Sequence, residues 1–200
     1  FKGGKNSEDY FNFDAYHTIN NDNNNVVGFF KSELKFKDYI WFLNEMDDNS
    51  NKIIFDKKLN NFNFDHFSLT HEIQRVDFNG LMKGNDFKDL EIKFNEVNIG
   101  KIIPDIENFT MDGNMNGVVN FKQNKTQFEP YASLNVNNLL VNNIKLGTIK
   151  LDIIGNDDFN IFNVTSTLEN ENVESFNLLG NLYFKDKIPT MNIDVKFDKF

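Results

Sequence analysis

The sequence predicts an all-β fold in which antiparallel strands follow one another as a meander. Alanine, the best helix former, occurs only as Ala15 and Ala132, while phenylalanine occurs 23 times in 200 residues. Asparagine, which favours turns over helix interiors, is the most abundant residue. Several segments also alternate strictly between apolar and polar residues, as strands with one dry face and one wet face do.

Three segments carry the strand prediction most firmly. Residues 191–198 place Met, Ile, Val and Phe at odd positions and polar residues at even positions, and residues 148–153 repeat the pattern. From 109 to 121 one parity of small and apolar residues persists without a break. A strand over that range would span about 43 Å at about 3.3 Å per residue, roughly twice the length of an ordinary strand.

Weaker alternation predicts further strands around residues 62–64, 76–82, 90–94, 134–141 and 176–184. Within residues 134–141 the apolar phase changes at Asn137-Asn138, between Val136 and Leu139. Hairpin-type turns are expected at residues 123–125, 155–158, 170–172 and 185–187. From residue 88 onward we therefore expect about eight strands joined by short turns.

Two segments and the N-terminus depart from this pattern. Residues 38–46 have apolar residues at helical spacing after Asp38, so we expect a short helix there. Residues 99–106 are expected to make one helical turn before Pro104 ends it. Residues 1–30 are the least regular, with at most one strand, from Tyr10 to Tyr16, and a polar loop at 20–25. The expected divisions are 1–30, 31–87 with the helix near 38–46, and 88–200.

Composition excludes several kinds of chemistry. The formal net charge of −9 disfavours nucleic acid and anionic membrane surfaces as partners. The absence of cysteine excludes disulfides and thiolate chemistry. No run of residues is long and apolar enough for a transmembrane helix. Because the chain begins at Phe1 and its last alternation runs almost to its end, we expect it to be a segment of a longer protein.

Candidate catalytic and metal-binding residues also fail on inspection. His66 and His71 are five residues apart on a β pattern, which predicts opposite faces and no shared metal. Residues 47–58 resemble a calcium loop only faintly, because Lys52 and Lys58 replace the required Gly and Glu. No nucleophile has a convergent base. We therefore predict a protein that is not an enzyme and that needs no metal or other cofactor.

The apolar stripe itself leaves two interpretations open. In a β-sandwich, the inner faces of two sheets would bury each other as an ordinary core. In a single long sheet, curled on itself, the dry face would line a groove for an apolar ligand. Long strands and meander connections favour the second interpretation, because sandwiches prefer short strands and crossing connections.

From residue 88 to the C-terminus, an ordered series of segments follows the same strand pattern. The segments are 90–94, 99–106, 111–119, Pro130 with 134–139, 144–149 and 178–184. This series, rather than one specific motif, resembles the Bacteroidetes-type TamB proteins (translocation and assembly module), which belong to the wider AsmA-like family. Residues 31–87 are similar more loosely, through Tyr39–Leu43 and Lys52–Phe55.

The resemblance implies an elongated, curled antiparallel sheet, a U-shaped β-taco whose hydrophobic interior bridges the inner and outer membranes. It implies phospholipid transport, with acyl chains as ligands, and outer-membrane protein assembly through an outer-membrane barrel partner. The corresponding location is the periplasm of the cell envelope, with the full-length protein anchored in the inner membrane. On this resemblance we expect the anchor and the terminal assembly region of that family to lie outside these 200 residues.

A groove of this kind would be lined by the dry face of the predicted strands. Glycines at 80, 113, 117 and 180 fall on the same parity, and we expect them to leave room for acyl chains or to let the sheet bend. The residues predicted to line the groove are Phe78, Leu90, Ile92, Phe94, Phe109, Met111, Met115, Val119, Phe121, Leu134, Val136, Ile149, Leu151, Ile153, Leu178, Leu182, Phe184, Ile193, Val195 and Phe197.

Two other functions remain open at the level of sequence. The chain could be a carbohydrate-binding or adhesive β-sandwich of a cell-surface protein, which would require a row of exposed aromatic residues on the wet face. It could also be a structural spacer, with a groove too narrow for an acyl chain. Most phenylalanines lie on the dry parity, which counts against the carbohydrate-binding alternative.

Overall fold

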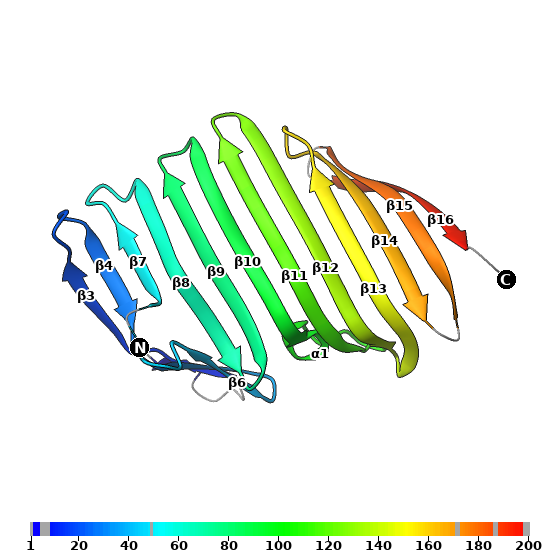
Figure 1. The fold of residues 1–200 in the computed structure, drawn as a ribbon, viewed down its shortest axis with the longest axis horizontal. Helices are drawn as coiled ribbons and strands as arrows, with labels where there is room; N and C mark the ends of the chain where they lie inside the picture. The colour runs from blue at the N-terminus through cyan, green and yellow to red at the C-terminus, as the bar shows by residue number, and fades with distance from the viewer. Residues whose placement is uncertain (1, 5–8, 49, 171–172, 186–187, 198–200) are drawn as a thin grey trace. The chain divides into compact units, whose positions relative to one another are not determined.

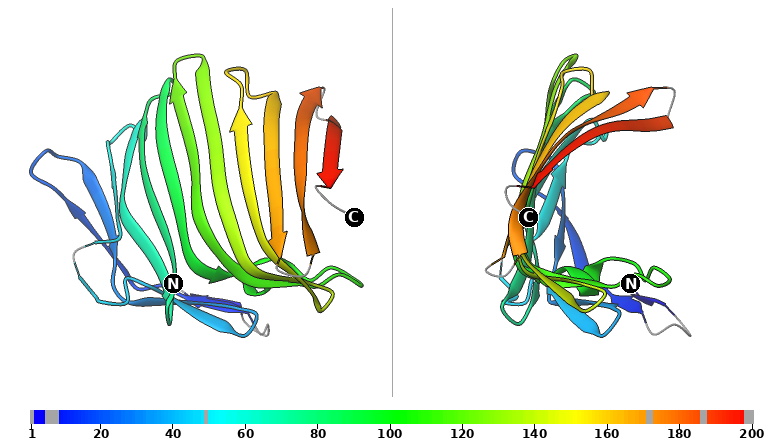
Figure 2. Two further views of the ribbon diagram at one scale, coloured as in Figure 1. Left: turned by 45° about the vertical axis from the view of Figure 1, so that its right-hand side comes forward. Right: turned by 90° about the vertical axis from the view of Figure 1, so that its right-hand side faces the viewer.

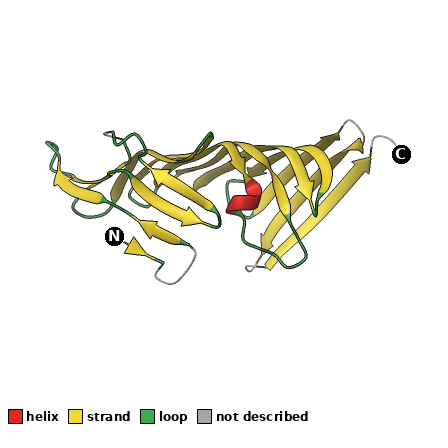
Figure 3. Cartoon of the chain, turned by 90° about the horizontal axis from the view of Figure 1, so that it is seen from below, coloured by secondary structure: helices red, strands yellow, loops and turns green. Residues whose placement is uncertain are grey.

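The structure, a computed structural model, describes residues 2–4, 9–48, 50–170, 173–185 and 188–197. These residues form sixteen strands and one short helix, which confirms the all-β prediction (Figures 1 and 3). The chain divides into two compact units, residues 1–96 and 97–200, called unit 1 and unit 2 below. The division falls near the end of strand β10, later than the division expected at residue 88.

Unit 1 is an antiparallel sheet that forks at strand β8. Strand β8 pairs with β9 along one edge, while its other edge is shared by β7, at residues 62–65, and β6, at residues 69–70. One branch continues from β6 through β5 and β2 to β1, and the other from β7 through β4 to β3. The strands are β1 (Lys2–Gly3), β2 (Tyr10–Asn12), β3 (Ala15–Ile19), β4 (Asn25–Phe29), β5 (Ser32–Phe36), β6 (Tyr39–Leu43), β7 (Lys52–Phe55), β8 (Asn61–His71), β9 (Gln74–Lys83) and β10 (Phe87–Asn98).

Buried polar side chains form hydrogen bonds with backbone N–H and C=O groups where the two branches separate. The Asn51 side-chain oxygen accepts a hydrogen bond from the Ser68 N–H at 2.8 Å. The Asn44 amide donates to the Phe29 carbonyl oxygen at 2.7 Å, and its oxygen accepts from the Asp48 N–H at 3.2 Å. The Ser32 hydroxyl accepts from the Asp14 N–H at 2.9 Å. Strands that leave the ladder at this fork thus keep partners for their backbone groups.

Unit 2 is a meander in which each strand pairs with the next along the chain. A single helical turn, α1 (Ile99–Ile102), precedes the strands, which curve along their length (Figure 2). The open, curled antiparallel sheet of the prediction is therefore confirmed. The strands are β11 (Met111–Asn124), β12 (Gln127–Val141), β13 (Ile144–Gly155), β14 (Ile161–Asn170), β15 (Val173–Lys185) and β16 (Ile188–Phe197).

The long strand expected over 109–121 corresponds to β11, which has 14 residues. Seven strands, β10 to β16, lie among the described residues from 87 onward, against about eight expected. The turns expected at 123–125 and 155–158 coincide with the β11–β12 and β13–β14 connections. Of the turns expected at 170–172 and 185–187, residues 171–172 and 186–187 lie outside the described residues.

The helix predicted for residues 38–46 is wrong, because this segment contains strand β6. It pairs with β5 along one edge and with β8 along the other, which buries Trp41 and Leu43. Asp38 lies in the β5–β6 hairpin turn beside Lys37, whose φ is 54°, and does not begin a helix. Tyr, Ile, Trp and Phe favour strands, so composition outweighs a spacing that both structures can accommodate. The helical turn before Pro104 is confirmed as α1.

The N-terminal segment is more regular than expected. The described residues up to 30 contain four short strands, β1 to β4, and the single strand expected from Tyr10 to Tyr16 is divided between β2 and β3. β2 pairs with β5, more than 20 residues away, so no local pattern indicated it. The polar segment at 20–25 contains the β3–β4 turn, in which the Asn20 side-chain oxygen accepts from the N–H groups of Asp22 and Asn24.

Two β-bulges keep apolar residues on one face of the sheet at points where the alternation of apolar and polar residues shifts by one position. In β12 the register shifts between Val136 and Leu139, with Asn138 at a φ of 54°, which confirms the predicted phase change. In β8 the register shifts between Phe64 and Phe67, with His66 at a φ of 50°. In each strand one extra polar residue restores the parity of the apolar residues that follow.

Gly113 and Gly117 of β11 have φ values of 142° and 138°, which residues with a side chain rarely adopt. A Cβ atom on Gly117 would collide with the Ser133 carbonyl oxygen, and one on Gly113 would lie 2.8 Å from Val136 Cγ1. The neighbouring strand β12 therefore occupies the space beside both glycines. Of the two expected roles, these positions support bending of the sheet rather than room for a ligand.

We predict that Gly117→Ala destabilises the protein by roughly 2–4 kcal/mol, because it adds backbone strain to a collision with β12. Gly84→Ala is the matched control, since Gly84 has a φ of 57° but open space around it, and should cost about 1 kcal/mol. Urea unfolding followed by circular dichroism measures both. Equal effects of the two substitutions would show that the close approach of β12 does not matter.

Candidate functional site

The candidate site is one face of unit 2, named here the apolar face. Directly opposed residues of antiparallel strands point to the same side of a sheet, so the strand registers define its members. Ser166 is the one polar side chain among them, and its hydroxyl donates to the Lys150 carbonyl oxygen at 2.9 Å. Crossing β11 to β16 in order, the four rows are Met115, Val136, Ile149, Leu168, Phe176, Phe197; Gly117, Leu134, Leu151, Ser166, Leu178, Val195; Val119, Ala132, Ile153, Val164, Gly180, Ile193; and Phe121, Pro130, Gly155, Phe162, Leu182, Met191.

Most of the apolar face is only half-buried. Leu134, Leu151 and Leu178 retain solvent contact in the middle of the sheet, and Met191 on β16 is 68% exposed. Among the described residues of unit 2, no second sheet packs on this face. The sandwich interpretation, in which a partner layer would cover these side chains, is therefore wrong.

The opposite face of the same strands is mainly polar. Its clearest row crosses β11 to β16 as Asn116, Asn135, Lys150, Thr167, Asn177 and Lys196. Lys150 Nζ lies 3.5 Å from Glu169 Oε1, a contact between exposed side chains. Larger apolar side chains on this face are scattered, such as Ile154 and Leu179. The sheet therefore separates apolar from charged side chains across its thickness.

Phenylalanine rings gather at the hairpin ends of the apolar face. Phe121, Phe128, Phe159, Phe162 and Phe184 form this aromatic rim, with centroid distances between contacting rings from 5.2 to 6.1 Å. Phe159 lies in the β13–β14 turn at a φ of 58° and contacts three of the other rings. Further from the hairpin ends, the residues that cross-strand pairing places on the face are mostly aliphatic.

The structure brings most of the predicted lining residues together. Met111 lies on the same side beyond the β12 bulge, opposite Val141. Phe109 precedes β11 and forms an isolated bridge with Ile106, so it is not part of the rows. The predicted residues found on the apolar face of unit 2 are Met115, Val119, Phe121, Leu134, Val136, Ile149, Leu151, Ile153, Leu178, Leu182, Phe184, Ile193, Val195 and Phe197.

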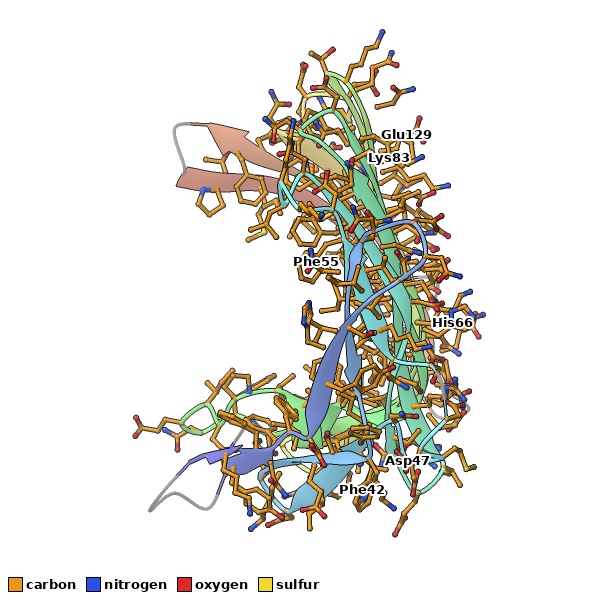
Figure 4. All side chains as sticks on the ribbon, turned by 90° about the vertical axis from the view of Figure 1, so that its left-hand side faces the viewer. Phe42, Asp47, Phe55, His66, Lys83 and Glu129 are labelled. Carbon is orange, nitrogen blue, oxygen red and sulfur yellow. The ribbon has the colours of Figure 1, made fainter. Side chains whose placement is uncertain are left out.

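The remaining predicted residues lie in unit 1 and share a face there. Phe78 pairs with Ile92, Leu90 with Gly80, and Phe94 with Val76. A row of rings continues this face from Phe78 through Phe64 and Phe62 to Phe55, with centroid distances of 5.1, 6.3 and 5.8 Å. Figure 4 shows Phe55 and the exposed His66 on opposite sides of this sheet.

Sequence reasoning missed part of the apolar face. Phe162, Val164 and Leu168 alternate with polar residues on β14, but Ser166 interrupts this pattern, so the strand was not predicted. Ala132 and Pro130 lie on β12 at the correct parity but are weak strand signals. Phe128 and Phe159 lie near or in turns, where alternation carries no information. Cross-strand pairing with predicted residues identifies the missed residues of β14 together with Ala132 and Pro130. Ring contacts with Phe121 identify Phe128 and Phe159.

In the described part of the chain, His66 and His71 make separate local contacts. His66 contacts its neighbour Asp65 at 3.1 Å on an exposed bulge. His71 stacks on Tyr39 at 4.0 Å, and its Nδ1 lies 2.9 Å from the Ile40 carbonyl oxygen. No group of three histidine, aspartate or glutamate side chains is placed to hold a metal among the described residues. The described residues also form no helix with the length and hydropathy that are needed to span a membrane.

Comparison of the chain with protein-family models, with curated proteins and with solved structures finds no match.

We predict that an open face tolerates truncation better than a buried position of the same strands. Leu151→Ala should cost about 1 kcal/mol, because the side chain is only half-buried, whereas Leu139→Ala should cost roughly 2–5 kcal/mol. Leu139, at the β12 bulge, is 4% exposed. Denaturant unfolding of the two variants provides the measurement, and a large loss for Leu151→Ala would indicate that another layer covers the face in solution.

Proposed function

We propose that the chain is a non-enzymatic lipid-conduit segment, in which the apolar face of unit 2 receives the acyl chains of phospholipids. The observation that carries the proposal is the continuity of four apolar rows across six strands, left half-exposed on one side of an open sheet. An exposed apolar surface of this extent is typical of a binding surface.

Burial of hydrocarbon supplies the driving force. Each CH₂ group of an acyl chain that leaves water for an apolar surface gains up to about 0.8 kcal/mol. Because the rows continue from β11 to β16, a chain could move from strand to strand without returning its whole length to water. The polar headgroup can stay in solvent beside the sheet, while the polar opposite face keeps a single-layer protein soluble.

The wider setting rests on the resemblance to TamB and AsmA-like proteins. We propose a periplasmic segment of an envelope-spanning protein, anchored elsewhere in the inner membrane, that moves phospholipid between the two membranes. In the same proposal, an outer-membrane barrel partner of the full-length protein connects the conduit to outer-membrane protein assembly. The long curled strands of unit 2 support this assignment of architecture.

The carbohydrate-binding sandwich is the less favoured function. It requires a closed core and a row of aromatic side chains on the polar face. On that face of unit 2, Tyr131 and Tyr183 are exposed, but they lie on β12 and β15 with two strands between them. The half-exposed aliphatic rows favour an apolar ligand instead.

We predict that Ile149→Arg and Leu151→Arg each reduce bound phospholipid about tenfold, because a guanidinium in the middle of the rows must be desolvated by an acyl chain. Met115 is left unchanged in this test, because it is buried and an arginine there would disturb the fold. Native mass spectrometry of protein incubated with phosphatidylethanolamine vesicles measures the occupancy. A photoreactive side chain in place of Leu178 should capture the same lipid.

Thr165→Arg is the matched control, since Thr165 is exposed on the opposite face of β14 and opposes Asp152. This variant should bind as much phospholipid as the unchanged chain. If the unchanged chain carries no lipid and the photoreactive variant captures none, the surface is a structural spacer and the conduit proposal fails.

A further inference from the structure

A pocket of about 500 Å³ lies in unit 1. It is formed by the ends of β7, β8 and β9 together with the β3–β4 turn. Ile54, Asn63 and Leu81 are consecutive cross-strand partners, so their side chains share one side of the sheet and contribute an aliphatic floor with an amide at its centre. A concave surface of this size accommodates a small molecule.

Two hydrogen-bonded turns hold the walls of this pocket in place. In the β3–β4 turn, Asn20 Oδ1 accepts from the N–H groups of Asp22 at 3.1 Å and Asn24 at 2.9 Å. In the β7–β8 turn, Asp56 Oδ1 accepts from the Asn60 N–H at 2.8 Å, and Asp56 Oδ2 accepts from the Asn61 amide at 2.7 Å. The walls are thus organised before any ligand arrives, which lowers the entropy lost on binding.

The hydrogen bonds to Asp56 also determine its charge. Donation from the Asn60 backbone N–H, followed by the groups of Asn61, lowers the pKa of the Asp56 carboxyl below its ordinary value. Asp56 is therefore ionised at neutral pH, and both of its oxygens are already engaged by the turn. Asp56 therefore stabilises the turn that forms a wall of the pocket and does not bind the ligand.

Four other polar groups of the lining have no hydrogen bond or ion pair from their side chains to the described protein. They are the Asp22 carboxylate, the Asn24 and Asn63 amides and the Lys83 ammonium. Lys83 Nζ lies 5.7 Å from the centre of the Phe87 ring, a contact that restrains it without using its hydrogen-bond donors. The pocket therefore offers two amides, one acceptor and one charged donor around its aliphatic floor.

This combination of groups favours one class of ligand. Amides donate and accept at once, which suits hydroxyl groups, since these do the same. Two carboxylates against one ammonium leave the lining with no positive excess, which disfavours phosphate and other anions. The Ile54 and Leu81 side chains can cover the C–H face of a ring. We propose that this pocket binds a neutral sugar, a function that does not depend on lipid binding by unit 2.

The test is titration of the whole chain with methyl glycosides of glucose, galactose, mannose and N-acetylglucosamine, followed by amide chemical shifts. At least one glycoside should give saturable shifts concentrated at Asn24, Ile54 and Leu81. Asp22→Ala and Asn63→Ala should each weaken binding about tenfold, through loss of hydrogen bonds to the ligand. Asp22 is exposed in its turn, so that variant keeps the fold.

Asn95→Ala is the matched control, because Asn95 is an exposed strand asparagine of unit 1 outside the pocket, and it should bind the glycoside as the unchanged chain does. Inorganic phosphate and glycine are titrated in parallel. No saturable shift with any glycoside would overturn the proposal, as would saturation by phosphate or glycine alone. Equal weakening by Asn95→Ala would show that the shifts do not report the pocket.

Discussion

The structure depends on one constraint, which is that every strand must keep its apolar residues on the same side of the sheet. Because side chains alternate with a period of two, a slip of one residue in any pairing would transfer a whole row to the polar face. The registers of β11 to β16 avoid this over four consecutive rows. Where the sequence itself changes phase, at Asn137-Asn138 and at Asp65-His66, a bulge absorbs one polar residue and the rows continue. Bulges also bend strands, so the device that preserves the apolar face contributes to its curvature.

The two units meet the backbone's need for hydrogen bonds in different ways. In unit 2 each strand has its sequence neighbour beside it, and the connections are short turns. In unit 1 the fork at β8 interrupts the ladder, and the buried side chains of Ser32, Asn44 and Asn51 supply partners that strands alone would not. An unpaired backbone group there would cost roughly 1–3 kcal/mol. Part of the high asparagine content therefore has a structural role that composition alone does not reveal.

Local alternation predicted most strands of unit 2 and the phase change in β12, because in a meander each strand's partner is its neighbour in sequence. It missed β14, in which Ser166 interrupts the alternation. The same reasoning failed where partners are distant. Tyr39–Leu43 has apolar spacing compatible with a helix, but its residue types favour a strand and its pairing with β5 and β8 stabilises one. Most of the apolar face was predicted, but Phe159 could not be, since its ring reaches the aromatic rim from a turn. The pocket of unit 1 is likewise invisible in the sequence, because its lining comes from three separate segments.

The distribution of ring and aliphatic side chains separates two kinds of apolar surface. Rings within about 5–7 Å of one another hold preferred relative orientations, so the phenylalanine row of unit 1 and the aromatic rim of unit 2 are stiff surfaces. Between that rim and the opposite ends of the strands, residues such as Ile149, Leu151 and Leu178 lie on an open face with few covering atoms, where side chains can change rotamer at little cost. A flexible hydrocarbon chain requires such an adaptable surface, whereas a rigid polar ligand requires fixed donors and acceptors. The aliphatic centre of unit 2 meets the first requirement, while hydrogen-bonded turns position the polar residues of the pocket in unit 1. This difference is the physical reason for proposing different ligands for the two surfaces.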